Sequence, residues 1–403
     1  PPISLSLNSV AVECRRQHNH QSVRSMTTVT VVTPAGRSAV ATLIVRGDAA
    51  VDIVSKRFEA AGPTAIAERA ANSISFGTWI HRQSTAEDVV VAKRDPFTVE
   101  IHCHGGTAAV RSIVDSLIAA GCRESDWRQF SQDSSKSPIV HDATVALANA
   151  STEKVAAILL DQLRGSLCNE TQEIIERLQN GEQNLAVEKL QQVRNRGDFG
   201  LHLTQPWKVV LAGPPNVGKS SLINALLGYQ RAIVFDQPGT TRDLVVAETA
   251  INGWPVSLSD TAGIRDSRDD IERQGVRQTH SAAAAADLVI LVRDSTQFGE
   301  LKFDPGQLSS PPRTLTVHNK MDIATTDKDC DLRVSAVTKE GIPELLELIA
   351  DKLVGVELPP GTPVPFAQHH LLAIDNALTA INGSQLAVAI SQLRHCFCGS
   401  ASW

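Results

Sequence analysis

An eight-residue segment, Gly213-Pro-Pro-Asn-Val-Gly-Lys-Ser220, constrains the fold of this chain more than any other feature. The apolar run 208–213 leading into it is typical of a buried strand, and Leu222, Ile223 and Leu226 after it have helical spacing. A glycine-rich loop between a strand and a helix lets successive backbone N–H groups surround phosphates at the helix N-terminus. The sequence therefore predicts a P-loop nucleotide-binding domain of the α/β class.

Three later segments follow predicted strands in the order of a GTPase domain. Asp260-Thr-Ala-Gly263 follows the run 255–258, Asn319-Lys-Met-Asp322 follows 314–317, and Ser335-Ala336 follows 332–334. Any one of them could be an ordinary turn, but their order at strand ends favours a nucleotide site. The predicted nucleotide contacts are Gly213, Asn216, Val217, Gly218, Lys219, Ser220, Ser221, Asp260, Thr261, Ala262, Gly263, Asn319, Lys320, Asp322, Ser335 and Ala336.

Each segment carries a group suited to one part of the nucleotide. Lys219 would place a positive charge on the outer phosphates, and the Ser220 hydroxyl would bind Mg2+. Asp260 would hold Mg2+ through water, and the Gly263 N–H would meet the γ-phosphate. The Asp322 carboxylate can accept the N1–H and N2–H2 protons of guanine, a pair that adenine does not offer. The sequence therefore predicts GTP with Mg2+ as the ligand.

Composition bounds the class of protein. A chain of 403 residues is too long for one ordinary core, so two or three domains are expected. No apolar run is long enough to span a membrane, and the net charge of -6 argues against a protein that simply coats nucleic acid. The seven cysteines are scattered without a disulfide framework, which predicts reduced thiols and a cytoplasmic location.

Changes of residue pattern divide the chain into four regions. Residues 1–25, which precede the first methionine, are expected to be a mis-called start or a short disordered tail. Residues 26–140 mix β-rich runs with an apolar helix near 108–120, which predicts a small α+β domain. Helical spacing in 141–204 and 364–403 predicts a helical domain in two segments, with Gly197 and Gly200 breaking its first part. The GTPase domain, 205–358, would be inserted between them.

One catalytic group of Ras-like GTPases is missing. Those proteins orient the attacking water with a glutamine two residues past the Asp-x-x-Gly turn. Here Ile264 and Arg265 follow Gly263, so another group must position the water.

Several segments resemble the tRNA-modifying GTPase family MnmE/TrmE. They are Asn216 in the P-loop, Gly239-Thr-Thr-Arg-Asp243, Asp260-Thr-Ala-Gly-Ile-Arg265 and Asp270-Ile-Glu272-Arg273. The resemblance implies a homodimeric, potassium-activated GTPase in which K+ replaces an arginine finger. It implies K+ ligands from Asn216, Phe235, Gln237 and Thr240, and a Mg2+ ligand from Thr241 beside Ser220 and Asp260. Glu272 would position the water, with Thr240 and Gly263 also catalytic; alternatively, Glu272 is a solvated helix carboxylate.

The N-terminal region resembles the same family more faintly. Thr33-Pro-Ala-Gly-Arg37 and Val99-Glu-Ile-His-Cys-His-Gly-Gly106 match motifs of the domain that dimerises the family and binds 5-formyl-tetrahydrofolate. Glu100 falls on a folate-contacting acid, whereas Ile44 stands where the family has a folate-contacting arginine. Folate binding is therefore expected to be weak or absent. His102, Cys103 and His104 could suggest zinc, but no second ligand pair is spaced for a closed site.

The C-terminus departs further from the family, which ends in Cys-x-Gly-Lys. Here the end reads Cys396-Phe-Cys-Gly-Ser400-Ala-Ser-Trp403, without the lysine. We expect Cys396 and Cys398 to be idle thiols in a disordered tail, with reactive thiols as the alternative.

Three functions fit these observations. The first is a potassium-activated dimeric GTPase of wobble-uridine tRNA modification, acting on tRNA with the family's flavin-dependent partner. The second is a divergent paralogue that has lost the one-carbon chemistry and works as a regulatory or ribosome-assembly GTPase. The third is a GTP-gated scaffold that barely hydrolyses its nucleotide. Ile44 and the altered C-terminus separate the first two, and Asn216 with Glu272 separates both from the scaffold.

Overall fold

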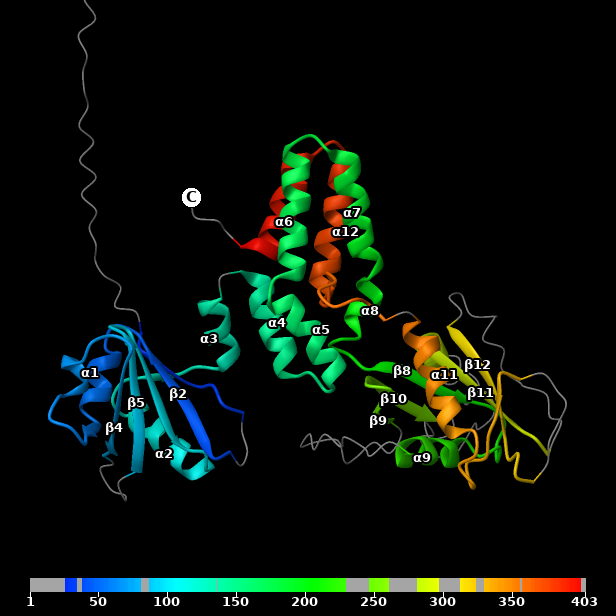
Figure 1. Cartoon of the computed structure of the whole chain (residues 1–403), viewed down its shortest axis with the longest axis horizontal. Helices are drawn as coiled ribbons and strands as arrows, with labels where there is room; N and C mark the ends of the chain where they lie inside the picture. The colour runs from blue at the N-terminus through cyan, green and yellow to red at the C-terminus, as the bar shows by residue number, and fades with distance from the viewer. Residues whose placement is uncertain are drawn as a thin grey trace, which may run out of the picture. The chain divides into compact units, whose positions relative to one another are not determined.

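The chain forms two compact units, residues Pro1–Asp133 and Ser134–Trp403 (Figure 1). The computed structural model describes residues 26–34, 38–80, 87–135, 137–229, 246–260, 281–296, 312–323, 330–355 and 357–399. No helix within these ranges is long and apolar enough to cross a membrane.

The first unit is a seven-stranded sheet packed against short helices. Its strand order is β3-β4-β5-β6-β2-β1-β7, antiparallel except for the β1–β7 pair. The strands are β1 (Thr28–Val31), β2 (Val40–Arg46), β3 (Phe58–Ala60), β4 (Ser73–Trp79), β5 (Glu87–Asp95), β6 (Thr98–His104) and β7 (Arg123–Glu124). The helices are α1 (Ala50–Ser55), η1 (Ile66–Glu68), α2 (Thr107–Ile118) and α3 (Trp127–Ser134). This is the α+β arrangement that the alternating β-rich runs predict.

The core of the first unit lies between one face of the sheet and its helices. Alternate residues of β2, including Leu43 and Val45, are fully buried, as the two-residue period of a strand requires. Ile113 and Leu117 of α2 join the same hydrophobic cluster. Sequence reasoning missed β3, β4 and α1.

Helices from both ends of the second unit pack together. They are α4 (Pro138–Ala148), α5 (Glu153–Leu163), α6 (Ser166–Gln179), α7 (Gln183–Asn195), α8 (Gly197–Leu201), α12 (Gln368–Asn382), α13 (Leu386–Leu393) and the π-helical turn η3 (Arg394–Cys398). In Figure 1 α12 stands beside α7, although the whole GTPase region separates them in sequence. The segment that leads back to these helices after the GTPase region is fixed by the fully buried side chain of Gln162. Its amide donates to Thr362 O at 3.0 Å and accepts from Val364 N at 3.1 Å.

Gly197 and Gly200 do not end the helical region as the sequence predicted. They lie within α8, a short helix that follows α7 directly. A Cβ on Gly200 would lie 2.0 Å from Pro365 O, and one on Gly197 would lie 2.3 Å from Leu371 Cδ2. These glycines are needed because another part of the chain passes close to the helix, which is a packing requirement rather than a break.

The remainder of the second unit is a six-stranded sheet of order β13-β12-β11-β8-β10-β9, in which only β9 is antiparallel to its neighbour. The strands are β8 (Trp207–Ala212), β9 (Val246–Ile251), β10 (Trp254–Asp260), β11 (Leu288–Asp294), β12 (Arg313–Asn319) and β13 (Leu332–Arg333); the helices are α9 (Lys219–Tyr229) and α11 (Ile342–Val354). β8 and β11 are almost continuously buried, as expected of parallel strands covered on both faces. The carboxyl ends of β8, β10 and β12 carry the three main sequence motifs.

The expectation of a disordered C-terminal tail is wrong as far as Gly399. Arg394–Cys398 is helical, and the Phe397 side chain is fully buried in the hydrophobic core of the second unit. Cys396 and Cys398 pack against that core and are half-buried. Burial of Phe397, whose apolar area the sequence argument did not weigh, fixes this segment on the helices.

Candidate nucleotide-binding site

The P-loop adopts backbone conformations that its residue types permit. Gly213 and Gly218 have φ of 155° and 92°, and Asn216 has φ of 63°. Asparagine tolerates the left-handed region better than most side chains, whereas glycine enters it without a Cβ penalty. A Cβ on Gly213 would also lie 2.2 Å from the carbonyl oxygen of Val292. The loop therefore requires glycine at both positions.

Lys219 lies across this loop. Its Nζ donates to the carbonyl oxygens of Gly213 and Pro214 at 3.2 and 3.1 Å, and the residue is only 6% exposed. The ammonium group is thereby held over the loop whose N–H groups are predicted to bind phosphates. An anionic ligand would stabilise this buried cation, because a charge away from water costs free energy unless it is paired.

Ser220, in the first turn of α9, meets Asp260 at the carboxyl end of β10. The Ser220 hydroxyl donates to Asp260 Oδ2 at 2.7 Å. β8 and β10 are parallel neighbours, and their register pairs Asp260 with Leu211. Sequence reasoning placed both side chains on one Mg2+, and the structure brings them together.

Asn319 connects the P-loop to the loop that follows β13. Its Nδ2 donates to Val217 O at 2.9 Å, and its Oδ1 accepts from Ala336 N at 3.1 Å. Only 2% of Asn319 is exposed. The Asn319 amide fits because residue 218 is glycine: a Cβ on Gly218 would lie 2.4 Å from Asn319 Nδ2. The side chain uses both ends of its amide to fix two loops that are far apart in sequence.

Lys320 also connects its loop to the P-loop, and it pairs with Asp294, a residue outside the sequence motifs. The backbone of Lys320 has φ of 68°, and its Nζ bonds to Asn216 O at 2.9 Å and Asp294 Oδ2 at 2.6 Å. Burial alone would raise the pKa of Asp294, but hydrogen bonds from Lys320 and Thr296 outweigh it and hold the pKa below its usual value. The sequence did contain a signal for Asp294, because it is an acidic residue at the end of the apolar run 288–294.

The predicted base-binding groups lie on the turn after β12 and the loop after β13. Met321 N donates to Val334 O at 3.1 Å, which joins these two segments. Asp322 is exposed, whereas Ser335 is fully buried and its Oγ accepts from Thr338 N at 3.0 Å. The site thus has an accessible carboxylate beside a rigidly bonded loop.

Comparison with known proteins identifies the family. The family model described as GTP-binding protein TrmE N-terminus matches residues 27–134, and the model described as 50S ribosome-binding GTPase matches 208–320. The tRNA modification GTPase MnmE of Protochlamydia amoebophila is 30% identical over 378 residues, which cover 83% of this chain and 81% of that protein. The chain belongs to the MnmE family of tRNA modification GTPases. This confirms the resemblance, the fold class and the GTPase activity predicted from the sequence.

Two further matches of this MnmE-family chain are shorter. The MnmE of Synechococcus sp. is 34% identical over 310 residues, covering 67% of this chain and 65% of that protein, so the match spans under two thirds of that relative. The solved G-domain of FeoB from Methanococcus jannaschii is 24% identical with a TM-score of 0.29, covering 37% of this chain and 98% of that domain.

Some site residues that the MnmE resemblance implies lie outside the described residues. This applies to the switch residues assigned to K+, to Thr241, to the last three residues of the Asp260–Gly263 motif and to the water-positioning glutamate. They are Phe235, Gln237, Thr240, Thr241, Thr261, Ala262, Gly263 and Glu272. Their roles stay predictions.

The first unit of this MnmE-family chain places Glu100 on β6, directly opposite Ile44 of β2. Arg94 Nη2 donates to Glu100 Oε2 at 2.6 Å, and His102 Nε2 lies 3.5 Å from the same oxygen. The hydrogen bond from Arg94 outweighs partial burial and lowers the pKa of Glu100. Glu100 is therefore an ionised carboxylate whose cationic partner is a residue that sequence reasoning did not single out.

The two histidines next to Cys103 also have partners of their own. His102 Nδ1 lies 3.0 Å from Thr42 Oγ1, and His104 Nδ1 lies 2.7 Å from Glu87 Oε1. Each imidazole is therefore paired with a side chain of a neighbouring strand of the sheet.

Proposed function

We propose that this GTPase serves the modification of tRNA wobble uridines and hydrolyses GTP with Mg2+ and K+. The observation that carries the proposal is the Ser220–Asp260 contact of 2.7 Å beside the buried Lys219, in a chain of the MnmE family. The proposed partners are tRNA, a second copy of this chain and a flavin-dependent subunit. Free thiols at the six described cysteines fit a cytoplasmic location.

The described part of the site fits Mg2+. A hydroxyl and a carboxylate oxygen are ligands that Mg2+ accepts, and the ion keeps several waters of its own. Ser220 would bind it directly, Asp260 through water and Thr241 from the first switch. The ion would neutralise charge on the β- and γ-phosphates during transfer. Lys219 and the P-loop N–H groups would hold the same phosphates in place.

Hydrolysis should be faster in K+ than in Na+. Asn216 would supply a side-chain oxygen to the cation, which replaces the charge of an arginine finger. Its backbone is held in position by the bond from Lys320 to its carbonyl oxygen. Loss of one charge-stabilising group at a transition state slows catalysis about 10²–10³-fold, so a difference of at least about tenfold is expected. Turnover in equal concentrations of KCl and NaCl measures it.

The matched variants are Asn216→Ala and Asn252→Ala. Both asparagines have a positive φ, of 63° and 48°, but Asn252 lies in the β9–β10 turn. Asn216→Ala should abolish the preference for K+, and Asn252→Ala should keep it. Equal rates in the two salts with the unaltered protein would rule out the potassium site.

The main alternative is a paralogue that has lost the one-carbon chemistry. Ile44 favours it, because the residue opposite Glu100 offers no cationic donor and Arg94 already occupies that carboxylate. Calorimetry with 5-formyl-tetrahydrofolate should therefore show weak binding or none. Ile44→Arg should strengthen binding about 10–100-fold, since a charge-assisted hydrogen bond contributes about 1.5–3 kcal/mol.

Val40→Arg is the control, because Val40 lies on the same face of β2 and is exposed. It should leave folate binding unchanged. Micromolar binding by the unaltered protein would show that Ile44 is compensated, and would favour full tRNA-modifying activity. Complementation of a strain lacking the tRNA-modifying GTPase, with the modified uridine measured by mass spectrometry, then separates tRNA modification from the other two functions.

A further inference from the structure

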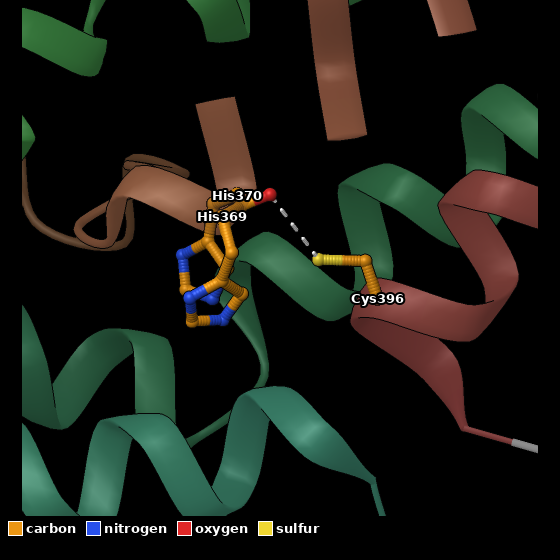
Figure 2. A group of neighbouring side chains, drawn as sticks. All are labelled: His369, His370 and Cys396. Carbon is orange, nitrogen blue, oxygen red and sulfur yellow. Dashed lines mark hydrogen bonds between the residues drawn. The ribbon is translucent and has the colours of Figure 1, made fainter. Parts of the chain in front are cut away.

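Three potential metal ligands converge in the helical part of the second unit, away from the nucleotide motifs. His369 and His370 belong to the first turn of α12, and Cys396 belongs to η3 (Figure 2). One ring nitrogen of each histidine and the Cys396 sulfur lie within 4.8 Å of one another. They form the only such group of three or more His, Cys, Asp or Glu side chains in the part of the chain that the structure describes.

A carboxylate from a third helix holds both imidazole rings. Asp142 Oδ2, on α4, lies 2.9 Å from His369 Nε2 and 3.1 Å from His370 Nε2. Both contacts end on one carboxylate oxygen, and a carboxylate can only accept, so each Nε2–H is the donor in this arrangement. With each Nε2 donating its own proton to Asp142, each Nδ1 keeps a lone pair.

The Nδ1 of His370 is the second observation that points to a ligand. His370 is fully buried, and this nitrogen has no hydrogen-bond partner among the described residues. A buried polar nitrogen without a partner is unfavourable, and each such group in a native protein calls for an explanation. Metal-bound histidines commonly donate their other N–H to a carboxylate, which is the arrangement at Asp142.

We propose that His369, His370 and Cys396 bind one zinc ion, with Asp142 positioning both rings and water completing the shell. Two imidazoles and a thiolate select zinc over Mg2+ or Ca2+, which prefer oxygen ligands. With bonds of about 2.0–2.3 Å in a tetrahedron, neighbouring donors stand about 3.3–3.7 Å apart, so a pair of donors now within 4.8 Å contracts by about 1.5 Å at most. The His369 side chain is 56% exposed, so the surrounding protein leaves room for that movement.

The Cys398 thiol is assigned elsewhere, because it is hydrogen-bonded to Cys168 of α6. The ion would join the first turn of α12 to η3, so it would fasten the C-terminal helical turn to the rest of the unit. Binding to the folded state alone raises the unfolding temperature.

The experiment uses the full chain, purified without a histidine tag and freed of metal by a chelator. Zinc is measured by elemental mass spectrometry after re-addition, and Co2+ titration reports a thiolate-to-cobalt absorption band. We expect one ion per chain and a rise in the unfolding temperature. Cys396→Ser and His369→Gln should each lower affinity at least about 100-fold, and Cys396→Ser should remove the band.

Two neighbouring residues provide matched controls. Cys398→Ser and the exposed His395→Gln lie in the same helical turn and should retain the ion, the band and the stabilisation. His369→Gln keeps the test decisive if Cys396→Ser fails to fold, because His369 is exposed and its loss leaves the core intact. Absence of bound metal in folded protein, or an unchanged band in folded Cys396→Ser, would overturn the proposal.

Discussion

Replacing Asp322 by asparagine should weaken GTP binding by about 10²-fold or more. The carboxylate would accept two N–H groups of guanine, and hydrogen bonds to charged groups contribute about 1.5–3 kcal/mol each. An amide presents one oxygen and one NH2, so a donor would face a donor of the base. The exposed position of Asp322 leaves it available to a ligand without a change of fold.

Xanthosine triphosphate provides the internal check on this assignment. Xanthine carries an oxygen where guanine has its amino group, so it can accept a hydrogen bond from the new amide. Its affinity relative to GTP should rise in Asp322→Asn and stay unchanged in Asp351→Asn, an exposed acid at the end of α11. Unchanged GTP affinity in Asp322→Asn would remove guanine recognition from this turn.

The nucleotide site could be predicted from the sequence because its geometry follows from local rules. Parallel strands end at one edge of a sheet, so motifs that each follow a strand must meet there. The contact between Ser220 and Asp260, 40 residues apart, is an example. The Asn319 side chain fits the same logic, because it follows β12 as Asp260 follows β10.

The parts that escaped prediction depend on partners that are distant in sequence. Gly200 looked like a helix breaker because nothing local shows that Pro365 approaches within 2.0 Å of its missing Cβ. Cys396 looked like part of a disordered tail because its apolar neighbour Phe397 has no local partner, although it is fully buried in the fold. His370 and Asp142 are separated by 228 residues, so no spacing rule could connect them.

Asn319→Ala should have the second large effect, on stability and GTP binding together. It removes two hydrogen bonds and leaves the buried Val217 carbonyl and the Ala336 N–H without this partner. Unsatisfied buried groups cost about 1–3 kcal/mol each, so a loss of about 2–5 kcal/mol is expected in the free energy of unfolding. Denaturant unfolding measures that loss, and nucleotide titration of the folded fraction measures affinity.

Gly218→Ala tests whether Asn319 acts by pressing on the P-loop. In the unaltered chain the new Cβ would lie 2.4 Å from Asn319 Nδ2, and the φ of 92° would be strained for alanine. Asn319→Ala removes the atom that clashes but leaves the backbone strain, so the two losses should not add. The double variant should be more stable than their sum by about 1 kcal/mol, within the usual range for residues in contact. If the two losses of stability add strictly, Gly218 and Asn319 do not interact energetically, and the P-loop conformation does not depend on the Asn319 side chain.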